Sequence, residues 1–350
     1  MDSMNKIMPV VSGIHDEKAL ADFMAKEQSS RLPLGYLQYR VTFIPDYSET
    51  ESIFVYKIHH SLADGIANIL FFNDMTDEPK LEGYPTILVR FSLLQDILIK
   101  LLLPFYLLWL TFKLLFVMKS EKNGFKNPAI TSKLNSLKNI KLIPDININD
   151  VKRCAAELTG PGIKVTINDV LMTVLSKTIY DYLRLKTEDK ETNFVNMACP
   201  FSLRPPPTAL GDYTFDNNFA IVNLKLRLVS SLSNGLKQIN RDMLDLKKSI
   251  EPIGLFYLIK LVMQLPGFIH WHIFEDYANK MTFGFSNVPG PKLPFVVAGR
   301  VNRGVGFIMP VGRSIVGSFS IISHVDVVKV IISMDKACME STDFISDLFL

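Results

Sequence analysis

Two hydrophobic periodicities alternate along this chain and predict an α/β protein. Residues 16–30 place their apolar side chains on one face at helical spacing. Residues 37–44 and 53–56 are instead rich in β-branched and aromatic side chains, which favours strands. Further strands are predicted at 194–198, 219–226, 283–288 and 327–334, and further helices at 148–158, 166–182 and 232–249.

The most apolar stretch, residues 87–118, is long enough to interact with a membrane. Its window 101–112 carries no charge, and extension to residue 118 includes one lysine near the end. A spanning helix needs about 20 apolar residues. A lysine at its end can extend to the lipid headgroups, and Pro104 would kink the helix without preventing a span. Three interpretations stay open: a spanning helix, an interfacial helix and a buried helix pair.

Seven lysines lie between residues 113 and 141, with Glu121 as the single acidic residue among them. A solvated linker has this composition, and beside a membrane helix the same lysines would face anionic lipid on the cytoplasmic side. We therefore divide the chain into an N-terminal half (1–118), a lysine-rich linker (119–145) and a C-terminal half (146–350).

Composition narrows the class of protein. The chain has 350 residues, enough for two domains, and its 48% hydrophobic content is high for a soluble protein. Its net charge of +3 gives no basis for nucleic-acid binding. Cys154, Cys199 and Cys338 lie far apart, which suits a reducing compartment better than a disulfide framework. The first residues do not resemble a signal peptide.

A second apolar stretch, residues 253–274, is interrupted by Lys260 and by helix-breaking residues, which makes it a weaker candidate for a span. We interpret it as a stretch able to line an acyl channel. His270 and His272 lie within it, but no third ligand has zinc-like spacing. The sequence therefore predicts no metal site.

The strongest chemical signal is the segment from His59 to Gly65, His-His-Ser-Leu-Ala-Asp-Gly. It lies where a predicted strand ends and a helix begins, a position that can hold one imidazole still and basic. Transfer of an acyl group to an alcohol needs a base beside the hydroxyl, and a neutral histidine with a pKa near 6.5 suits that task. The alternative is a polar pair that only terminates the strand.

This segment resembles the His-His-x-x-x-Asp-Gly signature of CoA-dependent acyltransferases. Those include chloramphenicol acetyltransferase, the condensation domains of peptide synthetases and the wax ester synthase/diacylglycerol acyltransferase family. Residues 286–291, Ser-Asn-Val-Pro-Gly-Pro, are close to identical with a motif of the last family that the other two lack. Residues 33–35 keep two positions of that family's Pro-Leu-Trp motif, and residues 200–207 resemble its Pro-x-Ser-x-Arg element.

The resemblance implies roles for the loop residues. His60, the second histidine, is the expected general base, and His59 is expected to support the loop. Asp64 is expected to point away from the substrate and to hold the loop through a salt bridge with an arginine. Arg204 is the candidate partner, with an ordinary surface arginine as the alternative.

The resemblance also assigns residues outside the loop. Asn287 is expected to hydrogen-bond the developing oxyanion or the hydroxyl group. Asn168 and Asp169 match the Asn-Asp-Val motif of the family, although helix capping alone would also explain them. Gly65 is expected to allow the backbone turn before the helix.

The resemblance implies two chloramphenicol-acetyltransferase-like domains, each a mixed sheet flanked by helices, with the active site in a tunnel between them. Family members have a longer N-terminal part, so the N-terminal domain is expected to be incomplete. The implied reaction joins a long-chain acyl group from acyl-CoA to a fatty alcohol or diacylglycerol, without a metal or redox cofactor. The expected location is the cytoplasmic side of the endoplasmic reticulum, the plasma membrane or a lipid droplet.

Two other interpretations remain. One is amide formation of the condensation-domain kind. The other is a catalytically impaired paralogue that binds lipid or a full-length partner. The sequence does not choose between alcohol and diacylglycerol, because acceptor pockets depend on three-dimensional shape.

Overall fold

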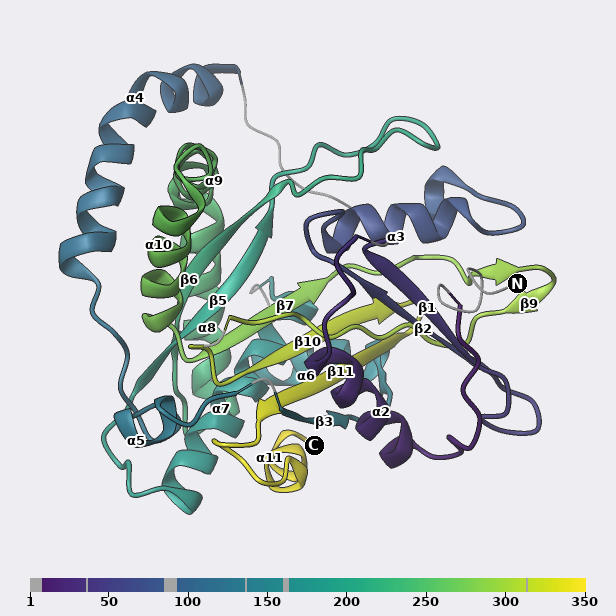
Figure 1. Cartoon of the computed structure of the whole chain (residues 1–350). Helices are drawn as coiled ribbons and strands as arrows, with labels where there is room; N and C mark the ends of the chain where they lie inside the picture. The colour runs from purple at the N-terminus through teal and green to yellow at the C-terminus, as the bar shows by residue number, and fades with distance from the viewer. Residues whose placement is uncertain (1–7, 36, 85–92, 136, 160–163, 313) are drawn as a thin grey trace.

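The C-terminal part of the chain forms a seven-stranded mixed sheet (Figure 1). The computed structural model describes residues 8–35, 37–84, 93–135, 137–159, 164–312 and 314–350. In the helix that begins at residue 93, it describes the side chains from residue 97 onward. The sheet order is β3-β11-β10-β7-β5-β6, with β4 also paired to β11. The strands are β3 (Lys138–Leu142), β4 (Ile146–Asn147), β5 (Phe194–Ser202), β6 (Phe219–Arg227), β7 (Phe283–Val288), β10 (Gly317–His324) and β11 (Val327–Asp335).

Both strand orientations occur in this sheet. β7 pairs in parallel with β10 and β5, whereas β10 with β11 and β5 with β6 are antiparallel. The expected fold class, a mixed α/β sheet flanked by helices, is therefore confirmed. A short antiparallel pair, β8 (Val296–Val297) and β9 (Arg300–Val301), projects from the chain between β7 and β10.

One face of the sheet packs against a helix that is buried along most of its length. Leu175 and Ile179 of α7 (Ile167–Lys186) share one core cluster with Phe283 and Phe319. Because side chains alternate across a strand, every second residue of β7 faces this helix. Around α7 lie α6 (Ile148–Thr159), α8 (Leu232–Lys248) and α11 (Asp343–Phe349).

The N-terminal part lies across the other face. β1 (Tyr39–Ile44) and β2 (Ile53–Ile58) form an antiparallel hairpin, and α2 (Glu17–Ser29) packs along β3. Ala21 of α2 contacts the sheet through Ile140 and Ile331. Ile331 alternates with residues that face α7, so α2 covers the opposite face. The helix α3 (Gly65–Asp74) follows β2, and the 3-10 turn η1 (Leu81–Gly83) follows α3.

The predicted linker contains ordered elements. Residues 119–145 include α5 (Pro128–Thr131) and β3, and β3 pairs with β11. The segment is also bound to the sheet by buried groups, since Glu121 accepts hydrogen bonds from the Asn196 amide at 2.8 Å and the Thr282 hydroxyl at 2.7 Å.

The two apolar stretches form three helices. The first gives α4 (Leu93–Phe112) and a π-helical turn, η2 (Lys113–Val117), while its beginning at 87–92 lies outside the described residues. The second gives α9 (Glu251–Val262) and α10 (Gly267–Asn279), separated at Pro266. Figure 1 shows α4 running alongside α9 and α10.

Candidate active site

The two histidines lie in the short loop between β2 and α3. The loop ends at Asp64, the N-cap of α3, whose Oδ1 accepts a hydrogen bond from the Ala67 amide at 2.8 Å. An aspartate at this position satisfies an amide that has no partner within the helix. The cap fixes one end of the loop, and the last strand residue, Ile58, fixes the other.

Asp64 is turned into the protein and meets Arg204. The Arg204 Nη2 lies 3.0 Å from Asp64 Oδ2, and only 3% of Arg204 and 4% of Asp64 are exposed. The Asn218 amide donates to the same carboxylate oxygen at 2.9 Å. The candidate arginine and the loop aspartate, 140 residues apart in sequence, thus form a buried ion pair that is not available to a substrate.

Arg204 has further partners at the end of the β5–β6 loop. It donates to the Thr214 and Asp216 carbonyl oxygens, each at 3.0 Å, and to the Asp216 carboxylate at 2.5 Å. The Asp216 carbonyl also accepts from the Asp64 amide at 3.1 Å. One guanidinium therefore joins the histidine loop to the segment that enters β6.

His60 is held by a side chain from that same segment. The His60 Nδ1 lies 2.9 Å from Asn217 Oδ1, and the Asn217 Nδ2 donates to the His60 carbonyl at 2.7 Å. Since the amide nitrogen is used as a donor, Oδ1 accepts, and the hydrogen-bond network assigns the proton to Nδ1. The Nε2 lone pair is then free. The imidazole also lies near the Phe219 ring, with centroids 5.4 Å apart.

His59 has local partners. Its Nδ1 lies 2.7 Å from the Ser61 hydroxyl, and its backbone amide donates to the Gln38 carbonyl on the segment before β1. Both imidazoles are exposed. His59 is thus tied to its own loop, whereas His60 is tied to the C-terminal half.

The end of β7 brings two other predicted residues together. Asn287 shares the sheet face of Phe285, which looks toward α7, because the two are two positions apart on one strand. Its Nδ2 donates to Asn168 Oδ1 at 2.9 Å. Asn168 lies in the first turn of α7. The amide pair therefore joins the end of a central strand to the start of the central helix.

Asp169 has a different environment from Asn168. It forms a capping box with Thr166, whose amide donates to Asp169 Oδ2 at 2.8 Å, and it accepts from Asn240 Nδ2 at 2.9 Å. It is 1% exposed. Asp169 thus stabilises the helix start from inside, while the neighbouring asparagine reaches the strand end.

Gly65 and the Pro-Gly turn after β7 lie close to other parts of the chain. A Cβ at Gly65 would lie 3.4 Å from Val288 Cγ2, so the start of α3 packs on the end of β7. A Cβ at Gly290 would lie 1.8 Å from the Ser323 carbonyl oxygen. That glycine allows the turn to cross β10 at backbone contact.

Residues 216–349 match a family model described as the WS/DGAT C-terminal domain. This C-terminal part of the chain belongs to the WS/DGAT family. The family expected from the motifs is therefore confirmed for residues 216–349. No curated protein sequence matches the chain. Asn217 and Asn287 lie inside the matched WS/DGAT domain, whereas the histidine loop lies outside it.

The fold of this chain is similar to those of several solved structures. The wax ester synthase/diacylglycerol acyltransferase from Marinobacter aquaeolei VT8 has a TM-score of 0.62 at 15% identity, covering 99% of this chain and 78% of that one. The epimerization domain from the third module of tyrocidine synthetase B has a TM-score of 0.54 at 13% identity, with 98% and 77% covered. A starter condensation domain of rhizomide synthetase RzmA, in complex with C8-CoA and Leu-SNAC, reaches 0.52 at 12%, with 98% and 76% covered.

The β5–β6 loop also holds the far end of α3. The Gly211 amide donates to Asp74 Oδ2 at 2.9 Å, and the Tyr84 hydroxyl donates to the same carboxylate at 2.8 Å. Burial and the adjacent carboxylate raise the pKa of Tyr84 well above its ordinary value. Phe215 packs edge-on against Phe71 with ring centroids 5.3 Å apart. One loop thus contacts both ends of the helix that follows the histidines.

The sequence alone assigns Asn217 no separate role. The residue only fits the WS/DGAT pattern in which a glycine and an asparagine follow the Pro-x-Ser-x-Arg element. Its contact with the histidine loop reveals what the side chain does. The signal in the sequence is position alone, two residues before the strand β6.

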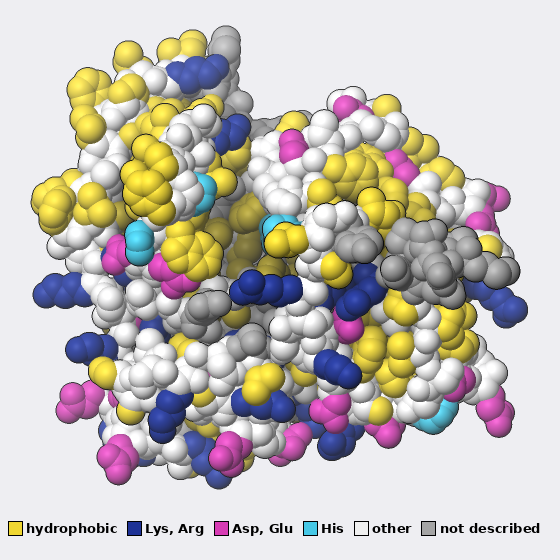
Figure 2. All heavy atoms as spheres, viewed as in Figure 1, with side chains coloured by type: hydrophobic (Ala, Val, Ile, Leu, Met, Phe, Trp, Pro, Cys, Tyr) yellow, Lys and Arg dark blue, Asp and Glu magenta, His cyan; other side chains and the backbone are white. Residues whose placement is uncertain are grey.

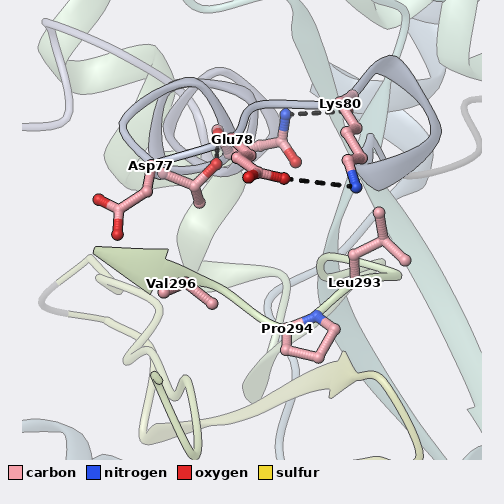
Figure 3. A pocket seen from close by; sticks show the side chains of 8 residues that line it. Asp77, Glu78, Lys80, Leu293, Pro294 and Val296 are labelled. Carbon is pink, nitrogen blue, oxygen red and sulfur yellow. Dashed lines mark hydrogen bonds and ion pairs between the residues drawn. The ribbon is translucent and has the colours of Figure 1, made fainter. Parts of the chain in front are cut away.

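A cavity of about 450 Å³ lies elsewhere, between the end of α3 and the segment before β8 (Figure 3). Its lining includes Asp77, Glu78, Lys80 and Leu293, and none of the candidate active-site residues. Glu78 faces Lys80, with the charged atoms 3.8 Å apart. Within the described part of the chain, no group of three or more His, Cys, Asp or Glu side chains could hold a metal ion.

Proposed function

We propose that this chain is an acyl-CoA-dependent O-acyltransferase. It transfers a long-chain acyl group from acyl-CoA to the hydroxyl of a fatty alcohol or diacylglycerol and forms a wax ester or triacylglycerol. The observation that carries the proposal is the orientation of His60. Asn217 holds its Nδ1–H and its carbonyl group at once, which leaves an unprotonated Nε2 on an exposed loop.

His60 is the proposed general base. Nε2 takes the hydroxyl proton as the alcohol oxygen attacks the thioester carbonyl, and a tetrahedral intermediate forms. When the intermediate collapses, the carbon–sulfur bond breaks, and the same proton passes from Nε2 to the departing CoA thiolate. No acyl-enzyme is needed, and the reaction needs no redox cofactor because it neither oxidises nor reduces the acyl group.

Asn287 is the proposed donor to the developing oxyanion. One of its two N–H groups is used by Asn168, which fixes the orientation of the amide. The second N–H can then stabilise negative charge on the former carbonyl oxygen. Asn168 acts as a positioning residue in this proposal, and Asp169 supports the helix that carries it.

Asp64, Gly65 and Arg204 are proposed to hold the loop. A carboxylate that is paired with a buried guanidinium and caps a helix is engaged on both oxygens. It is therefore poorly suited to proton transfer, and its contribution is to fix the loop on which His60 is presented.

Purified protein with radiolabelled acyl-CoA tests the proposal directly. Hexadecanol and dioleoylglycerol are supplied as separate acceptors, and a long-chain amine serves as the third. Ester from either alcohol supports O-acyl transfer, whereas amide alone would support the condensation-type alternative, whose fold is shared by two of the similar structures. Absence of any product from all three acceptors contradicts the enzyme proposal and favours a lipid-binding role.

The substrates imply a location. Both proposed acceptors dissolve in lipid, so the protein would act at a membrane or lipid-droplet surface, with its catalytic part on the cytoplasmic side where acyl-CoA is found. The described residues contain one helix, Ile97–Val117, that is long and apolar enough to cross a membrane by length and composition.

A further inference from the structure

The exposed hydrophobic side chains of this protein are concentrated in two stretches of the chain. About half of the large exposed hydrophobic residues in the described part lie within 97–117 and 257–271. The first stretch belongs to α4 and η2, and the second belongs to α9 and α10. Figure 2 shows hydrophobic side chains gathered over these helices on one face of the molecule. A soluble monomer rarely exposes so extended an apolar surface without a partner.

The inner side of α4 is fixed to the protein. Leu110 is fully buried in a cluster with Leu255 of α9 and Val222 of β6. A Cβ at Gly254 would lie 2.5 Å from Tyr106 Cε1, so the two helices approach closely at that glycine. A helix that crosses a bilayer is surrounded by lipid or by other spanning segments. α4 instead lies sideways on a helix that packs against the central sheet.

The outer side of α4 is strongly apolar. Phe105 is 72% exposed and Leu108 is 73% exposed, and Phe116 of the following turn η2 is 71% exposed. The outer surface of α10 has the same character, with Phe268 at 69% and Trp271 at 56%. Helices that lie in a membrane interface bury one such face and keep the other on the protein or in water.

The charged side chains within both stretches are basic. Residues 97–117 and 257–271 contain Lys100, Lys113 and Lys260 but no aspartate or glutamate, and Lys119 follows closely. The same helices carry Asp96, Glu251, Glu275 and Asp276 outside these stretches, and Glu251 and Asp276 are paired with Lys113 and Lys280. Lys113 is paired with Glu251, with the charged atoms 3.0 Å apart, whereas Lys119 and Lys260 are exposed. Anionic lipid headgroups complement such a surface. A second copy of the chain would instead bring like charges together.

We propose that α4, α9 and α10 form one lipid-docking face that lies flat on an anionic lipid surface. The helices enter the headgroup and upper acyl region from one side, and α4 does not cross the bilayer. This inference deepens the proposed function by naming the surface through which the protein reaches its lipid acceptor. Its test is a binding measurement and does not depend on the reaction.

The two tryptophans of the chain allow a direct test. Trp109 on α4 and Trp271 on α10 are both exposed, by 54% and 56%, and the sequence contains no other tryptophan. Trp271→Phe leaves Trp109 as the single emitter, and Trp109→Phe leaves Trp271. Each variant is mixed with vesicles of phosphatidylcholine and phosphatidylserine that carry bromine either near the headgroups or near the bilayer centre.

Flat docking predicts that both tryptophans shift to shorter emission wavelength and are quenched more by the shallow bromines than by the deep ones. If α4 spans the bilayer, Trp109 lies near the middle of the span and is quenched more by the deep bromines than by the shallow ones. Trp271 is then not quenched. Either of these last two results, or no quenching of both residues at any vesicle concentration, overturns the proposal.

Sedimentation with the same vesicles tests the second part of the face separately. The double variant Leu261→Ser and Phe268→Ser removes apolar area from α9 and α10 and leaves α4 intact. We expect its bound fraction to fall several-fold, and Leu185→Ser on α7, 63% exposed in the native chain, to bind like the native protein. A bound fraction unchanged in the double variant contradicts docking through α9 and α10.

Separate measurements distinguish loss of docking from three other outcomes. These outcomes are misfolding of the double variant, self-association and loss of the reaction. If the double variant melts early, the single-tryptophan quenching still decides the question, because those variants keep aromatic residues at both positions. Sedimentation velocity without lipid detects a dimer, and a dimer that vesicles fail to dissociate contradicts the proposal. Ester formation from a water-soluble short-chain alcohol, assayed without vesicles, reports the proposed reaction independently of docking.

Discussion

Asn217 holds His60 through two hydrogen bonds that run in opposite directions. The imidazole Nδ1–H donates to the amide oxygen over 2.9 Å, and the amide nitrogen donates to the His60 carbonyl over 2.7 Å. The two residues lie 157 positions apart. One side chain from the C-terminal half therefore fixes both the backbone and the tautomer of a residue in the N-terminal half.

We expect Asn217→Asp to change the pH dependence of the reaction. A carboxylate beside Nδ1–H stabilises the imidazolium form of the side chain. The acid limb of kcat/KM should therefore move to higher pH. Asn217→Ala should lower kcat about 10-fold or more, because the imidazole loses its orientation. Thr208→Ala on the same loop is the control, and a pH profile identical in Asn217→Asp and native protein contradicts the assignment.

Replacement of the two histidines should have unequal effects. His60→Ala removes the proposed base and is expected to lower kcat by about 10²–10⁴-fold. His59→Ala removes a side chain that binds its own loop at Ser61 and should cost less than about 10-fold. Both variants should melt at the native temperature, because both imidazoles are exposed. Equal losses of activity in two folded variants would contradict the assignment of His60.

Asp64→Asn should destabilise the fold as well as the reaction. It leaves the guanidinium of Arg204 buried without its buried carboxylate, and breaking such a pair costs about 3–5 kcal/mol. The retained contact with Asp216 should keep the loss at the lower end of that range. Asp216→Asn is the matched control, because this half-exposed carboxylate contacts the same Nη2 and is expected to contribute about 1 kcal/mol or less. Urea unfolding measures both, and equal effects would show that burial of Asp64 is unimportant.

Glu121 should make the stability depend on pH. Burial raises the pKa of its carboxyl to about 7 from the ordinary 4.5, although Thr282 and Asn196 donate hydrogen bonds to it. Because the folded-state pKa is the higher one, protonation favours the folded protein. The free energy of unfolding should therefore fall as the pH rises from 4.5 to 7, by up to about 1.4 kcal/mol per unit of pKa shift.

Glu121→Gln removes this titration and should flatten the pH dependence between pH 4.5 and 7. Urea unfolding at several pH values in that window measures the change in both proteins. Asp343→Asn at the exposed first position of the C-terminal helix is a suitable control, because the pKa of Asp343 is shifted downward instead, chiefly by its hydrogen bond to Lys141. An equally steep dependence in Glu121→Gln would assign the titration to another group.

The sequence determined the local elements and the chemistry-bearing loop. The hairpin, the helix after the histidines and the strand before the Pro-Gly turn were all predictable, because their periodicity and turn residues act within a few positions. The family was predictable from residues 59–65 and 286–291 for the same reason, since each motif is a short contiguous stretch.

Only the tertiary structure decided which distant residues meet. The sequence offered Arg204 as a candidate but did not show that it pairs with Asp64. It also did not join Asn168 to Asn287 or bring Asn217 to His60, because each contact depends on where the chain crosses the sheet. The apolar stretch around Trp109 is the clearest case. Its composition alone permitted a span, and the packing of Leu110 on α9 is a property of the folded protein that periodicity cannot encode.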